Sequence, residues 1–81
     1  MAKKQKWHIL GADGTEHVLT YTYSAFRREV TLTIDGECFL LPKGERQEPF
    51  RLGDEQAMLI IHRSGRAAIR TREGEAQEIK I

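Results

Sequence analysis

The sequence is poor in the residues that mark the more specialised classes of small protein. It contains one cysteine, Cys38, and two prolines among 81 residues. A single cysteine cannot form an intramolecular disulfide, which excludes a disulfide-stapled mini-domain. Nowhere do roughly 18 apolar residues follow one another, so no segment is predicted to span a membrane. Basic and acidic side chains nearly cancel, 13 against 12, which leaves no long-range field for nucleic acid or anionic lipid.

The length of the chain sets further expectations. Residues 1–81 are enough for one small domain, and we expect residues 1–5 to be disordered. The apolar stretch at residues 7–10 is too short for the core of a signal peptide, so we expect a cytoplasmic protein. A chain of this size buries only about 60–65% of its unfolded surface. Its stability is therefore expected to be marginal unless a partner or a second copy covers part of it.

What the sequence does contain is a series of short runs separated by glycine-containing turns. The runs are about five to eight residues long and rich in β-branched and aromatic residues, as is typical of strands. In the clearest run, Val-Thr-Leu-Thr-Ile at 30–34, strict alternation places the three apolar residues on one face. The Asp35-Gly36 dipeptide that follows is a strong hairpin signal, because both positions tolerate positive φ.

The pattern predicts eight strands, at residues 5–10, 16–23, 28–35, 37–41, 48–52, 56–62, 66–71 and 76–81. Pro49, near the start of the fifth, indicates an edge or strand-initiating position, where a missing N–H costs least. Eight short strands pack most simply as a compact antiparallel sandwich of two four-stranded sheets, one from each half of the chain. A small eight-stranded barrel is the alternative.

No group of residues has the spacing of a catalytic or metal site. His8, His17 and His62 lie in three different expected strands, without a His or Cys neighbour at ligand spacing. Cys38 follows Glu37, the opposite of the cationic environment that activates a thiolate, so we expect a buried small hydrophobe or an inert edge thiol. Phosphate loops and nucleophile elbows are absent. We predict a protein that is not an enzyme, with no cofactor, metal or small-molecule ligand.

Basic residues cluster toward the C-terminus. Arg63, Arg66, Arg70 and Arg72, together with nearby aromatic residues, have the composition of a surface that binds single-stranded nucleic acid in a small barrel. Acidic residues are interleaved through the same region. Cross-strand Arg–Glu pairing on a solvated sheet face explains both signs at once. The solvated face is therefore favoured, and nucleic-acid binding is kept as the alternative function.

Two apolar groups are candidate interaction surfaces. The first consists of Tyr21, Tyr23 and Phe26, and the second of Phe39 and Leu41. The face of strand 16–23 that bears the two tyrosines is either core, which is the commoner arrangement, or an exposed stripe that would serve as a dimer patch. Edge strands also offer unpaired N–H and C=O groups to a partner. We predict a non-catalytic protein-interaction module whose first partner to test is itself, as a homodimer.

The order of several motifs resembles a known family. The motifs are Trp7-x-Ile9-x-x-x-Asp13-Gly14, Val30-x-Leu32-x-Ile34-Asp35-Gly36-Glu37, Phe50-x-Leu52-Gly53, Ser64-Gly65 and Gly74-Glu75. Over residues 7–79 the chain resembles a single module of the Fas apoptotic inhibitory molecule family. The resemblance implies an eight-stranded antiparallel β-sandwich and a protein-binding role without catalysis. Residues 67–72 depart from the Tyr-rich strand usual in the family.

Overall fold

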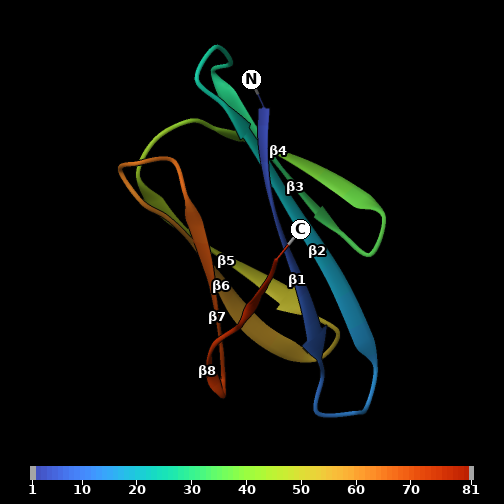
Figure 1. The fold of residues 1–81 in the computed structure, drawn as a ribbon. Helices are drawn as coiled ribbons and strands as arrows, with labels where there is room; N and C mark the ends of the chain where they lie inside the picture. Colours follow the sequence, from blue (N-terminus) through green and yellow to red (C-terminus); the bar gives the residue numbers. More distant parts are fainter. Residues whose placement is uncertain (1, 81) are drawn as a thin grey trace.

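The computed structural model describes residues 2–80, which form nine β-strands in two antiparallel sheets and contain no helix (Figure 1). The first sheet has the order β4-β3-β2-β1-β9 and consists of β1 (Ala2–Leu10), β2 (Glu16–Ser24), β3 (Glu29–Ile34), β4 (Glu37–Pro42) and β9 (Glu78–Ile79). The second has the order β5-β6-β7-β8 and consists of β5 (Arg46–Leu52), β6 (Glu55–Ile61), β7 (Ala67–Thr71) and β8 (Gly74–Glu75). The predicted antiparallel sandwich is confirmed. Neither sheet closes on itself, so the barrel alternative is wrong.

The C-terminal segment differs from the prediction. In place of one strand at 76–81, the chain forms two short strands in different sheets, β8 beside β7 and β9 beside β1. The sheets therefore have five and four strands instead of four each. The crossing from β8 to β9 covers one long side of the sandwich and supplies backbone partners to the free edge of β1. Along the part of the chain that the structure describes, no helix is long and apolar enough to cross a bilayer.

The N-terminal strand begins earlier than expected. β1 starts at Ala2, and its register with β2 extends from Ala2↔Ser24 to Leu10↔Glu16. Residues 2–5, which we expected to be disordered, are part of the sheet because β2 is long enough to pair with all of β1; Met1 lies outside the described residues. Gln5 is also buried in the core.

Alternation along the strands places one face of each sheet in a shared core. Trp7, Leu19 and Tyr21 of the first sheet and Leu59 and Ile69 of the second are at most 1% exposed and belong to one cluster of buried residues. Burial of one large apolar side chain stabilises a fold by about 1.5–3 kcal/mol. The core is therefore continuous between the two sheets, although, β9 apart, each sheet comes from a different half of the chain.

The β3–β4 hairpin confirms the turn predicted at Asp35-Gly36. Both residues have positive φ, 49° and 88°, as a type I′ turn requires. The carboxylate of Asp35 also accepts a hydrogen bond from the backbone N–H of Val18 on β2, at 2.8 Å. The turn is thus fixed to the neighbouring strand and holds β4 at the outer edge of the five-stranded sheet.

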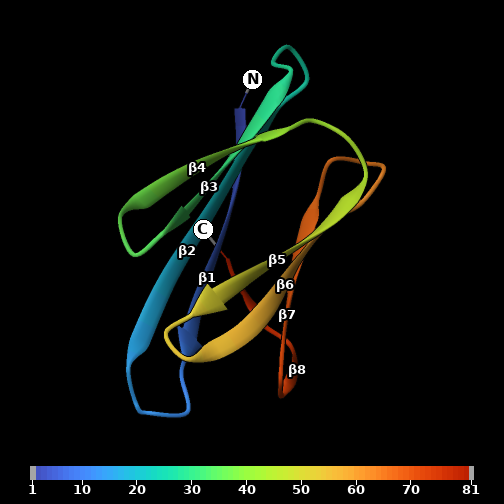
Figure 2. The ribbon, with the colours of Figure 1, turned by 180° about the vertical axis from the view of Figure 1, so that it is seen from behind.

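β4 and β5 are both edge strands and lie on the side away from the β8–β9 crossing. They are joined at one end by residues 43–45 and separate toward the other end (Figure 2). The edge position of Pro49 is confirmed, since β5 pairs with β6 alone. Among residues 2–80, no strand bridges the two sheets on this side of the sandwich.

Candidate functional site

The side of the sandwich between β4 and β5 contains an apolar groove of about 190 Å³. Phe39 and Leu41 line it from β4, and Pro49 and Phe50 line it from β5, with the buried Leu59 of β6 beneath them. The predicted surface of Phe39 and Leu41 is therefore located at the one long side where the core is open to a partner.

β4 is apolar on both of its faces. The register with β3 puts Phe39 and Leu41 on the inner face and Cys38 and Leu40 on the outer face. Leu40 is 63% exposed and Phe39 is 41% exposed. Cys38 is exposed too, so of the two environments we expected for it, the structure has the edge thiol. An apolar edge strand of this kind is the surface that soluble proteins normally avoid.

The other three sheet edges have protective features that β4 lacks. β8 and β9 are two residues long, too short to pair with a strand of ordinary length. β5 contains Pro49 and the charged residues Arg46, Glu48 and Arg51; proline removes a backbone donor, and charges resist desolvation. Between its first and last residues, β4 reads Cys-Phe-Leu-Leu, with no charge and no proline.

The hairpin determines which backbone groups of β4 point away from β3. In a hydrogen-bonded β-turn the carbonyl of the first residue, Ile34, accepts from the N–H of the fourth, Glu37. Hydrogen-bonded and non-hydrogen-bonded pairs then alternate along an antiparallel ladder. Glu37, Phe39 and Leu41 are therefore in hydrogen-bonded pairs with β3, and Cys38 and Leu40 are in non-hydrogen-bonded pairs. The N–H and C=O groups of Cys38 and Leu40 consequently point away from β3. The middle of β4 offers two donors and two acceptors to a neighbouring strand.

The predicted surface of Tyr21, Tyr23 and Phe26 is not continuous. Tyr21 is fully buried, its hydroxyl donates to the carbonyl of Gly65 at 2.8 Å, and burial raises its pKa to about 12. Tyr23 is half-buried and stacks on Tyr21 with ring centroids 5.3 Å apart. Phe26, in the loop after β2, is 86% exposed. The expectation that Tyr21 belongs to an interaction surface is wrong, because its face of β2 is covered by the second sheet.

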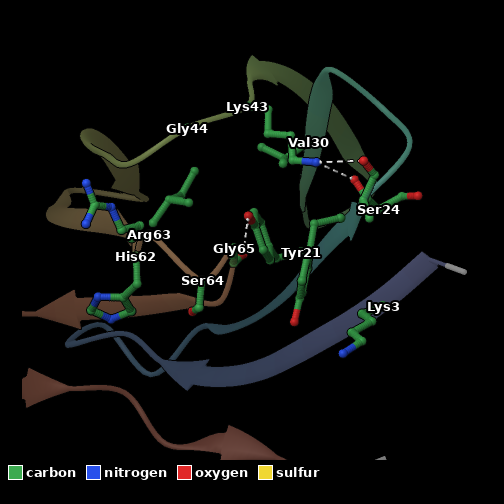
Figure 3. Close-up of a pocket in the computed structure, with 13 residues that line it drawn as sticks. Lys3, Tyr21, Ser24, Val30, Lys43, Gly44, His62, Arg63, Ser64 and Gly65 are labelled. Atoms are coloured by element: carbon green, nitrogen blue, oxygen red, sulfur yellow. Dashed lines mark hydrogen bonds between the residues drawn. The ribbon is translucent and has the colours of Figure 1, made fainter.

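A second hollow, which we call the end pocket, lies at one end of the sandwich and has a volume of about 310 Å³. Figure 3 shows His62 and Arg63 on one side of it and Ser24 and Lys43 on another. Its lining consists of Lys3, Tyr21, Tyr23, Ser24, Ala25, Val30, Lys43, Gly44, Ile61, His62, Arg63, Ser64 and Gly65. The sequence did not predict this pocket, since five separate segments contribute to it and none has a local motif.

The lining of the end pocket includes three basic side chains. Lys3, Lys43 and Arg63 contribute positive charge, and the lining includes no aspartate or glutamate. The ammonium of Lys43 donates to the backbone carbonyls of Ser24 and Ala25 at 3.0 and 3.1 Å, which fixes its position at the wall (Figure 3).

The four arginines considered for nucleic-acid binding do not share one surface of a single sign. Arg66 forms an ion pair of 3.0 Å with Glu78, and Arg70 lies opposite Glu75 in the β7–β8 register. Arg63 lines the end pocket, whereas Arg72 is in the turn between β7 and β8. Acidic neighbours accompany two of the four, in keeping with the interleaved charges of the sequence.

The opposite end of β2 holds a histidine–aspartate pair. Nδ1 of His17 lies 2.6 Å from Oδ2 of Asp35, and it must carry the proton because an ionised carboxylate can only accept. This hydrogen bond, followed by the one from Val18, keeps the pKa of Asp35 below its ordinary value. His8 pairs with Glu16 at 3.3 Å. Among residues 2–80, no three His, Cys, Asp or Glu side chains are grouped so as to hold a metal ion.

Comparisons of the chain with protein-family models, with curated proteins and with solved structures gave no match. The geometry of the molecule offers two candidate sites: the β4 edge with its adjoining groove, and the end pocket.

Proposed function

We propose that the protein is a non-catalytic interaction module that forms a homodimer through antiparallel pairing of β4 with β4 of a second copy. The observation that carries the proposal is the contrast among the four sheet edges. β5 is protected by proline and charge, and β8 and β9 by their shortness, whereas β4 exposes a six-residue strand whose four central residues, 38–41, are apolar. An edge of this type is stable in water when another strand covers it.

A second copy is the occupant that fits the free backbone groups best. When the two-fold axis passes between the two Phe39 residues, Cys38 of each copy lies opposite Leu40 of the other. Each Cys38–Leu40 pair then exchanges two hydrogen bonds, so all eight free groups of the two strands are satisfied. A two-fold axis at Leu40 would instead place Cys38 opposite Pro42, which has no N–H to donate. The axis at Phe39 is therefore favoured.

The side chains support the same arrangement. Leu40 and Cys38 of the two copies would meet on the outer face, and the two Phe39 rings would meet on the inner face beside the apolar groove. Apolar surface that water now contacts at Phe39 and Leu40 would be buried, and Glu37 would lie opposite Leu41 of the other copy at the end of the pairing. One strand pair is smaller than a standard interface, so we expect dimerisation to depend on concentration.

Sedimentation velocity across a concentration series tests the proposal, with Leu40→Lys and Leu10→Lys as a matched pair. Both leucines lie on the outer face of the first sheet, 63% and 66% exposed, but Leu10 ends a central strand. We expect the wild type and Leu10→Lys to form dimers as concentration rises, and Leu40→Lys to remain monomeric. A wild type that stays monomeric at high concentration contradicts the proposal, and so does equal dimerisation of both variants.

The remaining predictions about function agree with this proposal but do not carry it. The resemblance to the Fas apoptotic inhibitory molecule family implies a protein-binding role and stays a prediction. Cytoplasmic location and the absence of catalysis are likewise predictions from the sequence. The dimer experiment depends on none of them.

A further inference from the structure

Charge is distributed unevenly between the two ends of the sandwich. Strands β1 to β8 run alternately in opposite directions, so successive loops lie at opposite ends (Figure 1). The loops at the end that holds the N-terminus span residues 25–28, 43–45 and 62–66, and their charged residues are Arg27, Arg28, Lys43, Glu45, Arg63 and Arg66. The turns at the other end span residues 11–15, 35–36, 53–54 and 72–73, and their charged residues are Asp13, Asp35, Asp54, Arg72 and Glu73. The first end is therefore basic and the second acidic, although the whole chain is nearly neutral.

The β4 edge has one charge of each sign, near its two ends. Glu37 is the first residue of β4, and Lys43 directly follows the last. The N–H of Lys43 donates to the carbonyl of Arg28 at 2.8 Å, so the ladder between β3 and β4 continues through position 43. By alternation, Glu37 and Lys43 lie on the same face as Phe39. Both charged residues are exposed, and neither belongs to an ion pair among residues 2–80.

The proposed dimer brings these opposite charges together. With the two-fold axis at Phe39, Glu37 of each copy lies opposite Leu41 of the other, and Lys43 is the next residue of that copy on the same face. Glu37 and Lys43 are then diagonal neighbours about 7–8 Å apart, within reach of long side chains. Backbone carbonyls of Ser24 and Ala25 accept two of the three ammonium protons of Lys43, which leaves one for a carboxylate.

We infer that the two charged ends orient the dimer, with a Glu37–Lys43 pair at each end of the β4–β4 ladder, and that they make dimerisation sensitive to salt. Antiparallel pairing sets the basic end of each copy beside the acidic end of the other. Parallel pairing would set like ends together, which repel one another. The inference rests on the proposed homodimer and adds what determines its orientation and its response to ionic strength.

Charge reversal tests the inference by sedimentation velocity. Glu37→Lys makes both pairs of a homodimer like-charged, and so does Lys43→Glu. We expect either variant alone to dimerise at least about tenfold more weakly than the wild type. An equimolar mixture of the two variants should dimerise as the wild type does, because each reversed charge then faces an opposite charge on the other chain.

Glu73→Lys is the matched control. It reverses an exposed acidic charge in the turn between β7 and β8, which belongs to the other sheet, and it should change dimerisation less than about twofold. Circular dichroism checks that each variant is folded.

Salt provides a second measurement. Raising sodium chloride from about 0.1 M to about 1 M shortens the Debye length from about 10 Å to about 3 Å. The wild-type dimer should therefore weaken at least about twofold. The double variant Glu37→Gln/Lys43→Gln has neither charge of the pair and should respond less.

The outcomes separate this inference from the proposed function. A wild-type dimer that Leu40→Lys disrupts, but that Glu37→Lys and Lys43→Glu leave unchanged, overturns the inference alone. A mixture that dimerises no better than either variant by itself overturns it as well, because the pairing of opposite charges then contributes nothing. A wild type that stays monomeric at high concentration overturns the proposed dimer and this inference with it.

Discussion

Gln5 of β1 and Ala67 of β7 exchange two hydrogen bonds across the sandwich. The side-chain Nε2 donates to the carbonyl of Ala67, and the side-chain Oε1 accepts from its N–H, each at 2.8 Å. β8 is too short to reach this part of β7, where its register includes Arg70 and Thr71 only. The amide of Gln5 therefore takes the place of a neighbouring strand and joins one sheet to the other.

Replacement of Gln5 by leucine should destabilise the fold more than its change in hydrophobicity suggests. A buried backbone group without a partner costs about 1–3 kcal/mol, and Gln5→Leu leaves both groups of Ala67 unsatisfied. We expect a loss of about 3 kcal/mol in the free energy of unfolding and a melting temperature lower by about 15 °C. Urea and thermal unfolding measure both. Gln56→Leu, an exposed glutamine on β6, is the control and should stay within about 0.5 kcal/mol of the wild type.

Local signals in the sequence were enough to predict the parts of the fold that local geometry determines. Alternation in 30–34 and the Asp35-Gly36 turn each depend on neighbouring residues, and the structure has both as expected. The C-terminal segment could not be predicted in this way. Two-residue strands are too short to alternate, and the switch between sheets depends on the free edge of β1, which exists only after the sheets have formed.

The candidate sites can be divided in the same way, into features that neighbouring residues determine and features that only the assembled sheets create. An apolar strand next to a strong turn is visible in the sequence at Phe39 and Leu41, and their role in binding stays a prediction. The sequence leaves the face of Tyr21 open between core and interaction surface, because alternation identifies the two faces of a strand but not which face the second sheet will cover. The end pocket had no signal at all, since the segments that line it are far apart in the sequence and only the topology places them around one hollow.

The pKa of Asp35 predicts how stability depends on acid. Hydrogen bonds from His17 and Val18 keep this pKa below its ordinary value of 3.8 in the folded state. A lowered carboxyl pKa contributes stability that is present above the unfolded pKa and is lost as pH falls through the folded pKa. We therefore expect the free energy of unfolding of the wild type to fall more steeply below about pH 4 than that of Asp35→Asn. Urea titrations over this pH range measure the difference.

Asparagine is a suitable replacement at this position because it tolerates the positive φ of residue 35 and so preserves the turn. Asp54→Asn, in the exposed turn between β5 and β6, removes one charge elsewhere and serves as the control. Parallel acid profiles for the wild type and Asp35→Asn would contradict the stabilising role of the pair.

The raised pKa of Tyr21 predicts that the folded state loses stability at alkaline pH. Burial raises its pKa to about 12, so the folded state keeps the hydroxyl protonated where the unfolded chain ionises near pH 10. The stabilisation is present below about pH 10 and disappears as pH rises toward about 12, a total on the order of 3 kcal/mol. Tyr21→Phe should lose less stability over this interval than the wild type. Absorbance at alkaline pH follows the ionisation, and a wild-type Tyr21 that titrates near pH 10 while folded would contradict the prediction.

The register proposed for the dimer predicts which single cysteine crosslinks the two copies. With the two-fold axis at Phe39, the two residues at position 39 form a non-hydrogen-bonded pair with Cα atoms about 4.5 Å apart, within the span of a disulfide. The two residues at position 40 are diagonal neighbours, farther apart than the limit of about 7 Å. On a Cys38→Ser background, Phe39→Cys should form a covalent dimer under mild oxidation, and Leu40→Cys should not. Non-reducing electrophoresis distinguishes them, and a dimer from Leu40→Cys alone would place the axis at Leu40 instead.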